Sequence, residues 1–353
     1  MKVGLLSMHR VYNFGSFWQA YCLMQMLKAN GASDVEFIDI IPGQKDTVTH
    51  YKKKFSFSKI KRIPYYMFQK KKANIFRGVQ ASKLGLKDTM NYSTDYDAIV
   101  IGSDEVFHFT QSSPWGLSTQ LFGGMDHDHI STYAACFGST TMDKIVERGA
   151  LETIKGPLTN IKNISVRDDN SSQIISKILD REPEVNLDPV VVGDLPLDEI
   201  GHISDDKYIL VYSYDFRFAD PQYIKAIRAF AKDKGYKVYS VGFYQDWVDK
   251  NIICDPYELL AYFKDASYIV TDTFHGTIFS ARLHKQFVTV IRDTNKQKLT
   301  DLLSRLGMEA RMLDEEGDFE AKLTSEIDYE SFEKLRADSR RCSDEYLSKC
   351  LSV

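Results

Sequence analysis

The chain has 353 residues, which exceeds the size at which one hydrophobic core usually stops growing, so we expect two domains. With 43% hydrophobic and 27% charged residues, its composition is that of a packed soluble protein and excludes intrinsic disorder. The net charge of −4 gives no overall attraction to nucleic acid, and no apolar run approaches the roughly 20 residues that cross a bilayer. Five cysteines without paired spacing favour a reducing compartment, so we expect a cytoplasmic protein with neither a signal peptide nor a membrane anchor.

Strands and helices alternate along the first half of the chain. Residues 3–7 are predicted as a strand, 17–29 as a helix and 35–40 as a second strand, at the spacing of a βαβ unit. Because such units build parallel sheets, we expect a doubly wound domain over residues 1–195. Its remaining elements are predicted as strands at 97–102, 130–136, 163–167 and 190–192 and a helix at 171–179.

A second series of strands and helices begins after the polar segment 196–206, which contains proline and glycine. It predicts a second doubly wound domain over residues 206–325, followed by a tail, 326–353, whose single charged helix packs back on the first domain. The fold class is therefore α/β, with two Rossmann-like domains. The elements of the second domain are predicted as strands at 208–213, 237–241, 268–271 and 287–291 and helices at 221–234, 256–264 and 276–283.

An insertion at residues 47–87 interrupts the first domain and contains no acidic residue. Its lysines and arginines alternate with tyrosines and phenylalanines, and we expect it to be helical. One interpretation is a flap whose aromatic side chains pack on the first domain while the lysines face water. The other is peripheral contact with an anionic membrane surface, to which each basic residue would contribute about 1 kcal/mol. No recognised nucleic-acid motif accompanies the charges, so we expect no nucleic-acid partner.

The loops that directly follow strands are where chemistry is expected, because open α/β sheets bind ligands outside the carboxyl ends of their strands. Four such loops carry polar residues, at 13–16, 102–104, 167–168 and 271–277. In the last of them, His275 follows a buried strand and precedes Gly276 and Thr277 at a predicted helix start, whose N–H groups would suit an anion. Alternatively, His275 caps the helix or fills a polar niche in the core.

Two of the other loops allow a structural interpretation beside a functional one. Arg167 ends an apolar strand and either binds an anion or pairs with the two aspartates that follow it. Ser103 and Asp104 either line a site or form a strand-ending turn in which Asp104 caps the next helix. The acidic and histidine residues at 126–129 lack the spacing of a metal site and are expected to form a solvated loop, so we expect no metal.

Six motifs occur in a fixed order along the chain. They are Asn13-Phe14-Gly15 with Gln19-Ala20-Tyr21, Ile101-Gly102-Ser103-Asp104, Ser165-Val166-Arg167, Leu187-Asp188-Pro189, Thr271-Asp272-Thr273-Phe274-His275-Gly276, and Asn295 ahead of Asp301-Leu302-Leu303. In this order and spacing they resemble the polysaccharide pyruvyl transferase family, and the resemblance runs from Lys2 to about Gly307. Each motif alone is common, whereas the ordered set is specific.

The resemblance implies the two-domain, GT-B-like glycosyltransferase architecture. It also implies transfer of a pyruvyl group from phosphoenolpyruvate, held in an interdomain cleft, to a glycan or lipid-linked glycan in bacterial surface-polysaccharide synthesis. Phosphoenolpyruvate is then a donor substrate, and no cofactor is expected. The family's motif histidine corresponds to His275, which we expect to be the catalytic general acid. The residues expected to bind the donor are Arg167, Thr273, Gly276, Thr277 and Asn295, and those expected on the acceptor side or in the cleft are Asn13, Gly15, Gln19, Ser103, Asp104 and His108.

The chain departs from the family at one motif. Phe107 and His108 stand where the family usually has a tryptophan and an asparagine, which would alter the acceptor-side wall, and a catalytically inactive glycan-binding relative is therefore one alternative. A nucleotide-sugar-dependent glycosyltransferase on the same scaffold is another. Many retaining glycosyltransferases carry a closely spaced pair of glutamates in the second domain, whereas here no glutamate occurs between Glu258 and Glu309, which disfavours that alternative.

Overall fold

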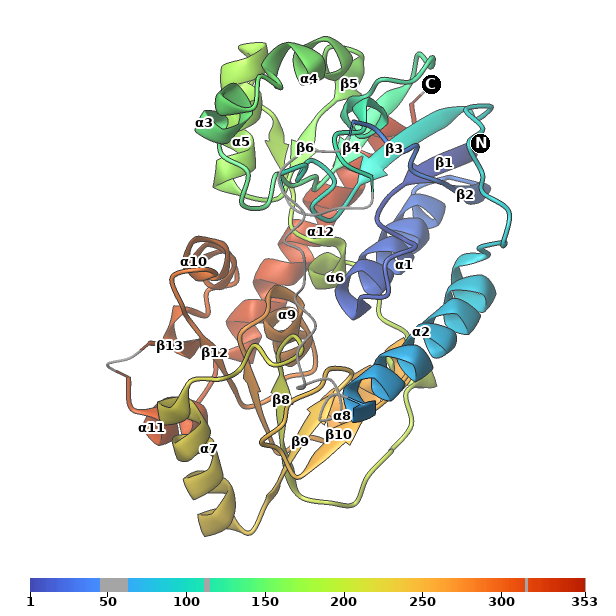
Figure 1. Ribbon diagram of the computed structural model, residues 1–353. Coiled ribbons are helices and arrows are strands. Elements are labelled where there is room, and N and C mark those ends of the chain that lie inside the picture. Colours follow the sequence, from blue (N-terminus) through green and yellow to red (C-terminus); the bar gives the residue numbers. More distant parts are fainter. Residues whose placement is uncertain (45–62, 111–114, 315–316, 353) are drawn as a thin grey trace. The chain divides into compact units, whose positions relative to one another are not determined.

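The computed structural model describes residues 1–44, 63–110, 115–314 and 317–352, and their packing divides the chain into two units (Figure 1). The first unit comprises described residues within 1–55, 80–195 and 336–353, and the second those within 56–79 and 196–335. Each unit is built on one parallel sheet, which confirms the predicted α/β fold with two doubly wound, Rossmann-like halves. Residues 47–62 of the predicted insertion lie outside the described residues. No helix in the described ranges is both long enough and apolar enough to cross a membrane.

The sheet of the first unit has the strand order β2-β1-β3-β4-β5, and its neighbouring strands run parallel. In this doubly wound order the winding reverses between β1 and β3, so ligands are expected at the carboxyl ends of those two strands. The strands are β1 (Lys2–Leu6), β2 (Asp34–Ile38), β3 (Ala98–Gly102), β4 (Ile130–Tyr133) and β5 (Ile161–Asn163), and a short separate pair is formed by β6 (Ser165–Val166) and β7 (Glu184–Val185).

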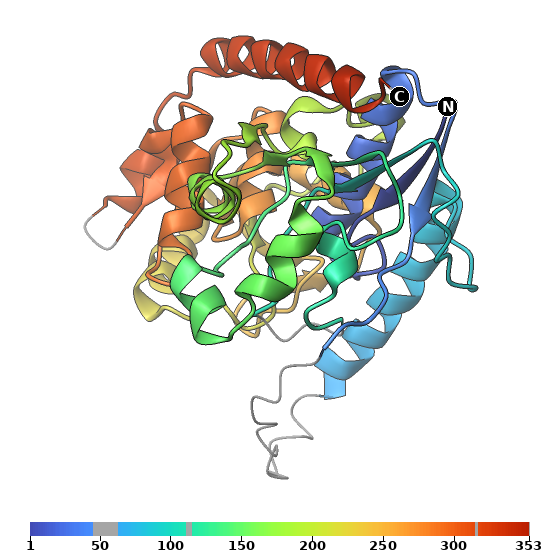
Figure 2. The same cartoon turned by 90° about the horizontal axis from the view of Figure 1, so that it is seen from above.

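Helices cover both faces of this first sheet (Figures 1 and 2). One face carries α1 (Phe14–Ala29), which begins at the capping residue Asn13, and the part of α12 (Tyr329–Cys350) that belongs to this unit. The Tyr346 hydroxyl of α12 donates a hydrogen bond to the carbonyl of Thr132 at 2.8 Å, which ties the helix to β4. The other helices of the unit are α3 (Met142–Glu147), α4 (Leu151–Leu158), α5 (Asp169–Leu179) and the short α6 (Pro189–Val192).

The sheet of the second unit has the order β10-β9-β8-β11-β12-β13, again with parallel neighbours. This is the Rossmann order, in which the winding reverses between β8 and β11. The strands are β8 (Tyr208–Tyr212), β9 (Lys237–Val241), β10 (Lys250–Ile252), β11 (Tyr268–Thr271), β12 (Phe287–Val290) and β13 (Met312–Leu313).

Alternate residues of β8 show how the second sheet is covered on both faces. Ile209 and Val211 belong to the core formed with α7 and α11, whereas the Tyr212 ring packs against Phe263 of α8 and Phe279 of α9, with ring centroids 5.2 and 6.2 Å away. Successive side chains of a strand point to opposite faces of the sheet, so a strand covered by helices on both faces carries apolar residues at both sets of positions. The helices are α7 (Pro221–Lys234), α8 (Pro256–Asp265), α9 (Phe274–Arg282), α10 (Lys296–Arg305) and α11 (Phe319–Thr324).

The described part of the insertion forms the helix α2 (Ile63–Leu84), and its residues up to 79 belong to the second unit. The Tyr65 ring packs on Phe216 with centroids 5.0 Å apart, and the Gln69 amide donates to the Asp215 carboxylate at 2.7 Å. Several aromatic side chains therefore pack on the second unit, whereas the flap interpretation placed them on the first domain. The exposed side chains of α2 include Tyr66, Met67, Lys70, Lys71 and Arg77.

The run Val190–Val192 is helical, although its β-branched residues predicted a strand. The Asp188 side chain accepts a hydrogen bond from the Val190 amide at 3.0 Å, and Pro189 occupies the first helical position. An aspartate cap followed by proline starts a helical turn irrespective of the strand propensity of the residues that follow.

Candidate functional site

Polar residues of the second unit gather where its strand order reverses. Strand β11 ends at Thr271 and is followed by Asp272, Thr273 and His275, while the segment after β8 carries Arg217. The carboxyl ends of β8 and β11 are adjacent because these strands pair directly, so both segments emerge at the same edge of the sheet. This is the position at which doubly wound sheets bind their ligands.

The start of α9 is closed by its own hydrogen bonds. The Thr273 hydroxyl accepts from the Gly276 amide at 3.0 Å, and the Thr273 carbonyl accepts from the Thr277 amide at 3.1 Å. A Cβ on Gly276 would lie 2.1 Å from the Thr271 hydroxyl oxygen, so the glycine is required for packing. Both amides that the sequence suggested for an anion are thus used within the helix start, and an anion here would need other partners.

His275 lies in the first turn of α9 and is half-buried. Its ring lies 5.3 Å from that of Phe274 and 6.0 Å from that of Phe279, measured between centroids. The helix is capped by Thr273, so His275 is not the capping residue that one alternative proposed. The residue as a whole is partly exposed, whereas its Nε2 is buried.

A buried carboxylate lies next to two arginines at this strand end. Asp272 is 1% exposed and pairs with the Arg292 guanidinium, and Arg217 Nε lies 3.8 Å from its Oδ2. Burial raises the pKa of the Asp272 carboxyl above its ordinary value, and the two arginines oppose that shift. Two cations around one carboxylate leave a local positive excess that would suit an anionic ligand. Sequence reasoning missed both arginines, although Arg292 follows β12 closely enough for the strand-end rule to have found it.

Asn295 holds this arrangement in place. Its side-chain oxygen accepts from the Arg292 backbone amide at 2.7 Å, and its amide nitrogen donates to the Asp272 carbonyl at 3.1 Å. The side chain is 8% exposed. Asn295 therefore fixes the segment that carries Arg292 against the segment that carries Asp272.

In the first unit, α1 is linked to the carboxyl end of β3. The Asn13 side-chain oxygen accepts from the Gly15 and Ser16 amides at 2.8 and 3.4 Å, and the Ser16 hydroxyl donates to Asp104 Oδ2 at 2.5 Å. Asp104 has a left-handed backbone, φ 76°, and no helix begins there in the described chain, so its predicted role as a helix cap is wrong. These contacts join the two strand ends at which the first sheet reverses its order.

Arg167 and Asp188 form a buried ion pair. Arg167 Nη1 donates to Asp188 Oδ2 at 2.9 Å, and Gln19 Nε2 donates to the same oxygen at 2.6 Å. Burial would lower the pKa of the guanidinium, but neighbouring Cys136 and Asp188 hold it above its ordinary value. The predicted surface pair is wrong in its location, because Arg167 is buried and the side chain of Asp168 caps α5.

His108 and Ser103 are both buried at the end of β3. His108 Nδ1 lies 2.8 Å from Glu105 Oε2, and its Nε2 lies 3.1 Å from the Ser139 hydroxyl. Phe107, the other departure from the family pattern, is fully buried in the core. The Ser103 hydroxyl has no hydrogen-bond partner among the described residues. At His108 and Phe107 the side chains serve packing and a local hydrogen-bond network.

The acidic and histidine loop at 126–129 makes local contacts. His127 Nε2 lies 2.8 Å from the Tyr96 carbonyl, and His129 Nδ1 lies 3.2 Å from Lys162 Nζ. Within the described ranges, no three histidine, cysteine or acidic side chains converge as a metal site would require.

Two parallel α/β sheets, each with polar side chains at its point of reversal, define the class of Rossmann-like two-domain proteins. The chain belongs to the polysaccharide pyruvyl transferase family, whose model matches residues 13–294. The match contains every predicted site residue except Asn295. The family is one of transferases, so the chain belongs to a transferase family. No curated protein sequence matches it significantly.

Several solved structures have similar chain folds at low identity. The UDP-GlcNAc 2-epimerase of Methanocaldococcus jannaschii, solved with UDP-GlcNAc and UDP, is 12% identical with a TM-score of 0.48, over 97% of this chain and 98% of that one. The glycosyltransferase SsfS6 of Streptomyces sp. SF2575, complexed with thymidine diphosphate, is 11% identical with a TM-score of 0.47, over 98% of both chains. The glycosyltransferase SnogD of Streptomyces nogalater is 10% identical with a TM-score of 0.47, over 100% and 98%. At this level the likenesses do not bear on substrate or activity.

Proposed function

We propose that the protein transfers the pyruvyl group of phosphoenolpyruvate to two hydroxyls of a glycan or lipid-linked glycan, forming a ketal. The observation that carries the proposal is the family match over residues 13–294, which includes the strand-end segment of His275. A glycan acceptor suits a family whose model describes polysaccharide modification. The half-buried imidazole and the positive excess around Asp272 add physical support, because the donor carries both a carboxylate and a phosphate.

The reaction defines what the residues must do. The methylene carbon of phosphoenolpyruvate takes up a proton, positive charge develops at the neighbouring carbon, and two acceptor oxygens bond to that carbon as the C–O bond to phosphate breaks. Of the two hydroxyl protons released, one balances the proton added to carbon and the other leaves with inorganic phosphate. The protein must therefore supply a proton at one atom and hold the anionic groups beside it.

His275 is the proposed general acid. Its ring lies between Phe274 and Phe279 at the strand end where the donor is proposed to bind, and an imidazole there would give its proton to the methylene carbon. Arg217, whose contact with Asp272 is loose at 3.8 Å, is proposed to bind the donor carboxylate or phosphate. Arg292 is paired more closely with Asp272 and contributes its positive charge to the end of β11.

The remaining predicted residues enter the proposal with more limited roles. Thr273, Gly276, Thr277 and Asn295 shape the donor-binding segment through the hydrogen bonds described above. Arg167 is proposed for the donor from the family resemblance. The proposed acceptor-side residues of the first unit are Asn13, Gly15, Gln19, Ser103, Asp104 and His108.

Peripheral membrane contact belongs to the proposal only through the exposed side of α2. Lys70, Lys71 and Arg77 are exposed there beside Tyr66 and Met67, a mixture that suits an anionic lipid surface. Co-sedimentation with phosphatidylglycerol vesicles at low salt should capture the protein, and no capture would remove membrane contact from the proposal.

Activity can be tested without knowing the acceptor in advance. The protein is incubated with phosphoenolpyruvate and a set of bacterial polysaccharides and lipid-linked oligosaccharides, and phosphate release is measured alongside the mass of the glycans. The proposal predicts phosphate release only with a competent acceptor, whose mass rises by one pyruvate less one water. Release without a change in glycan mass, or a mass change with nucleotide sugars instead, would contradict it.

A further inference from the structure

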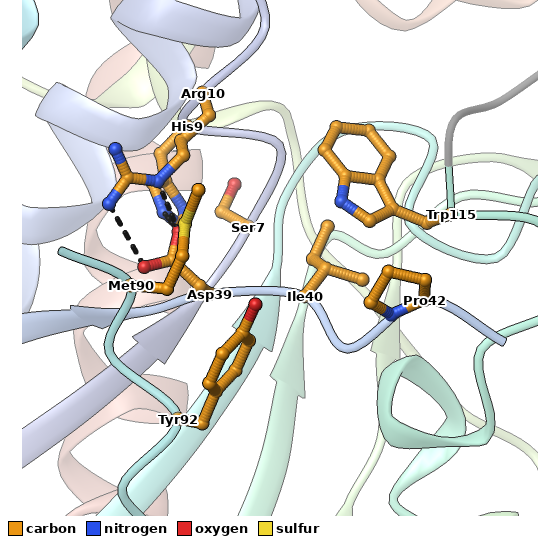
Figure 3. A pocket seen from close by; sticks show the side chains of 9 residues that line it. All are labelled: Ser7, His9, Arg10, Asp39, Ile40, Pro42, Met90, Tyr92 and Trp115. Atoms are coloured by element: carbon orange, nitrogen blue, oxygen red, sulfur yellow. Dashed lines mark hydrogen bonds and ion pairs between the residues drawn. The ribbon is translucent and has the colours of Figure 1, made fainter. Parts of the chain in front are cut away.

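A pocket lies in the first unit, at the carboxyl ends of β1 and β2 (Figure 3). It has a volume of about 210 Å³, and none of its residues was predicted as a site residue. Its lining residues are Ser7, His9, Arg10, Asp39, Ile40, Pro42, Met90, Tyr92 and Trp115.

The Asp39 carboxylate on the polar wall of this pocket is satisfied by its neighbours. His9 Nε2 lies 3.2 Å from Asp39 Oδ1, Arg10 Nη2 donates to Asp39 Oδ2 at 3.0 Å, and the Asn91 amide donates to the same carboxylate oxygen at 2.7 Å. Burial raises the pKa of the Asp39 carboxyl. The hydrogen bonds from His9 and Arg10 lower it further than burial raises it, so the pKa lies below its ordinary value. Burial lowers the pKa of His9. A charged carboxylate paired in this way shapes a wall and does not transfer protons.

Apolar and aromatic side chains form the rest of the lining. Tyr92 is 48% exposed and Met90 is 53% exposed, and Trp115 is half-buried. Large apolar side chains are seldom left open to water beside a formed cavity unless something covers them. In Figure 3, Trp115 and Tyr92 lie on different sides of Ile40.

Two buried polar atoms of the pocket, the Ser7 hydroxyl and His9 Nδ1, have no hydrogen-bond partner within the described residues. Figure 3 shows the Ser7 side chain between the Arg10 and Trp115 sides of the pocket. A buried hydroxyl without a partner loses free energy that a ligand hydroxyl would restore.

We propose that this pocket binds one pyranose ring of the glycan acceptor, an inference that rests on the proposed function for the class of acceptor. A pyranose has an apolar C–H face, which suits Trp115 and Tyr92, and hydroxyl edges, which suit Ser7 and the Arg10 guanidinium. The pocket is small enough for a single ring. A lipid chain would leave the Ser7 hydroxyl unsatisfied, and a nucleobase would find the oxygens of the Asp39 carboxylate already engaged.

The test uses saturation-transfer-difference NMR on the full chain in the absence of phosphoenolpyruvate. The probes are the methyl glycosides of glucose, galactose and mannose, octyl β-D-glucopyranoside and uridine. We expect transfer to the ring protons of at least one glycoside. It should weaken about tenfold in Trp115→Ala and in Tyr92→Ala, because each removes an aromatic face. Val146→Ala trims an exposed apolar side chain of the same unit outside the pocket and should change nothing.

Several outcomes would overturn the inference: no transfer to any pyranoside, transfer only to the alkyl protons of the octyl glycoside, transfer to uridine alone, or undiminished transfer in both pocket variants. The second of these would indicate a lipid chain and the third a nucleotide. Because the donor is absent, the result does not depend on phosphoenolpyruvate binding. Failure of the proposed reaction and failure of this pocket are therefore seen in different experiments.

Discussion

The strand ends of the two units differ in how their charges are balanced. In the first unit, Arg167 is matched by Asp188 in a buried pair, and Asp104 accepts from a neighbouring hydroxyl. In the second, one carboxylate, Asp272, lies between two arginines of which Arg217 is about a third exposed. Similar topology thus supports a self-satisfied network in one unit and a positive excess in the other. The positive excess in the second unit supports the proposal that His275 and Arg217 act there on an anionic donor, and four variants test it and the contrast with the first unit.

The largest effect is expected at His275. Replacing it with alanine removes the proposed proton donor, so turnover should fall by about 10² to 10⁴-fold while the fold is retained. Phosphate release with a competent acceptor is the measurement. His284→Ala is the matched control, because His284 is a half-exposed histidine of the same unit that pairs with Glu333. Near-normal turnover in the His275 variant would remove it from the mechanism.

The buried pair of the first unit should matter for stability. Asp188→Asn leaves the Arg167 charge buried without its counter-ion and should lower the free energy of unfolding by about 3–5 kcal/mol. Urea unfolding followed by circular dichroism measures the loss. Adding Arg167→Met to this variant should recover much of the stability, since the unpaired charge is then gone. Asp194→Asn, at an exposed carboxylate, serves as the control, and a loss as small as the control's would contradict the buried-pair account.

Lys72 of the second unit is a buried cation that lies over the ring of Phe243, with Nζ 4.1 Å from the centroid. Burial lowers its pKa to about 8, so the folded state binds fewer protons than the unfolded state between about pH 8 and the ordinary lysine value. Stability therefore rises with pH across that window. Lys72→Met should raise the free energy of unfolding by about 3 kcal/mol at pH 7, and its advantage should vanish as pH climbs through the window.

Urea unfolding at several pH values, followed by tryptophan fluorescence in a Trp18→Phe, Trp115→Phe background that leaves Trp247, measures the Lys72 effect in the second unit. Lys71→Met changes an exposed lysine on the same helix and should leave stability unaltered. An advantage of Lys72→Met that persists unchanged at high pH would show that burial of the charge is not its cause.

The smallest effect is expected at Arg217. Arg217→Met should weaken phosphoenolpyruvate binding about tenfold, because one charged contact to the ligand is lost. Titration calorimetry compares it with Arg228→Met, which removes an arginine of the same unit that is paired with Asp249. Equal affinity in the two variants would move the anion site away from Arg217.

The local pattern of the sequence predicted most of the fold. Helix α7 and strands β9 and β11 begin and end where hydrophobic periodicity and flanking turn residues placed them, because those signals are local. The run at 190–192 was missed because the capping pair Asp188 and Pro189 decides its start, which strand propensity does not register. Short elements such as β10 and β13 carry too few residues for a period to be visible.

The site was predictable only where it follows a strand directly. His275 and Arg167 were named as candidates in this way, whereas the partner of Arg167 was not, because Asp188 reaches it through the folding of the first unit. Arg217 and Arg292 come to Asp272 from different loops, and only the pairing of β11 with β8 and β12 brings them together. The pocket at the carboxyl ends of β1 and β2 likewise joins residues that follow those strands with Trp115, and no sequence motif marks this combination.

The most direct test of the central claim is isothermal titration of the purified protein with phosphoenolpyruvate, with a panel of nucleotide sugars as comparison. The account predicts saturable binding of phosphoenolpyruvate, weakened in His275→Ala, and no specific binding of the nucleotide sugars. Binding of a nucleotide sugar without binding of phosphoenolpyruvate would contradict it and leave the family's fold carrying a different reaction.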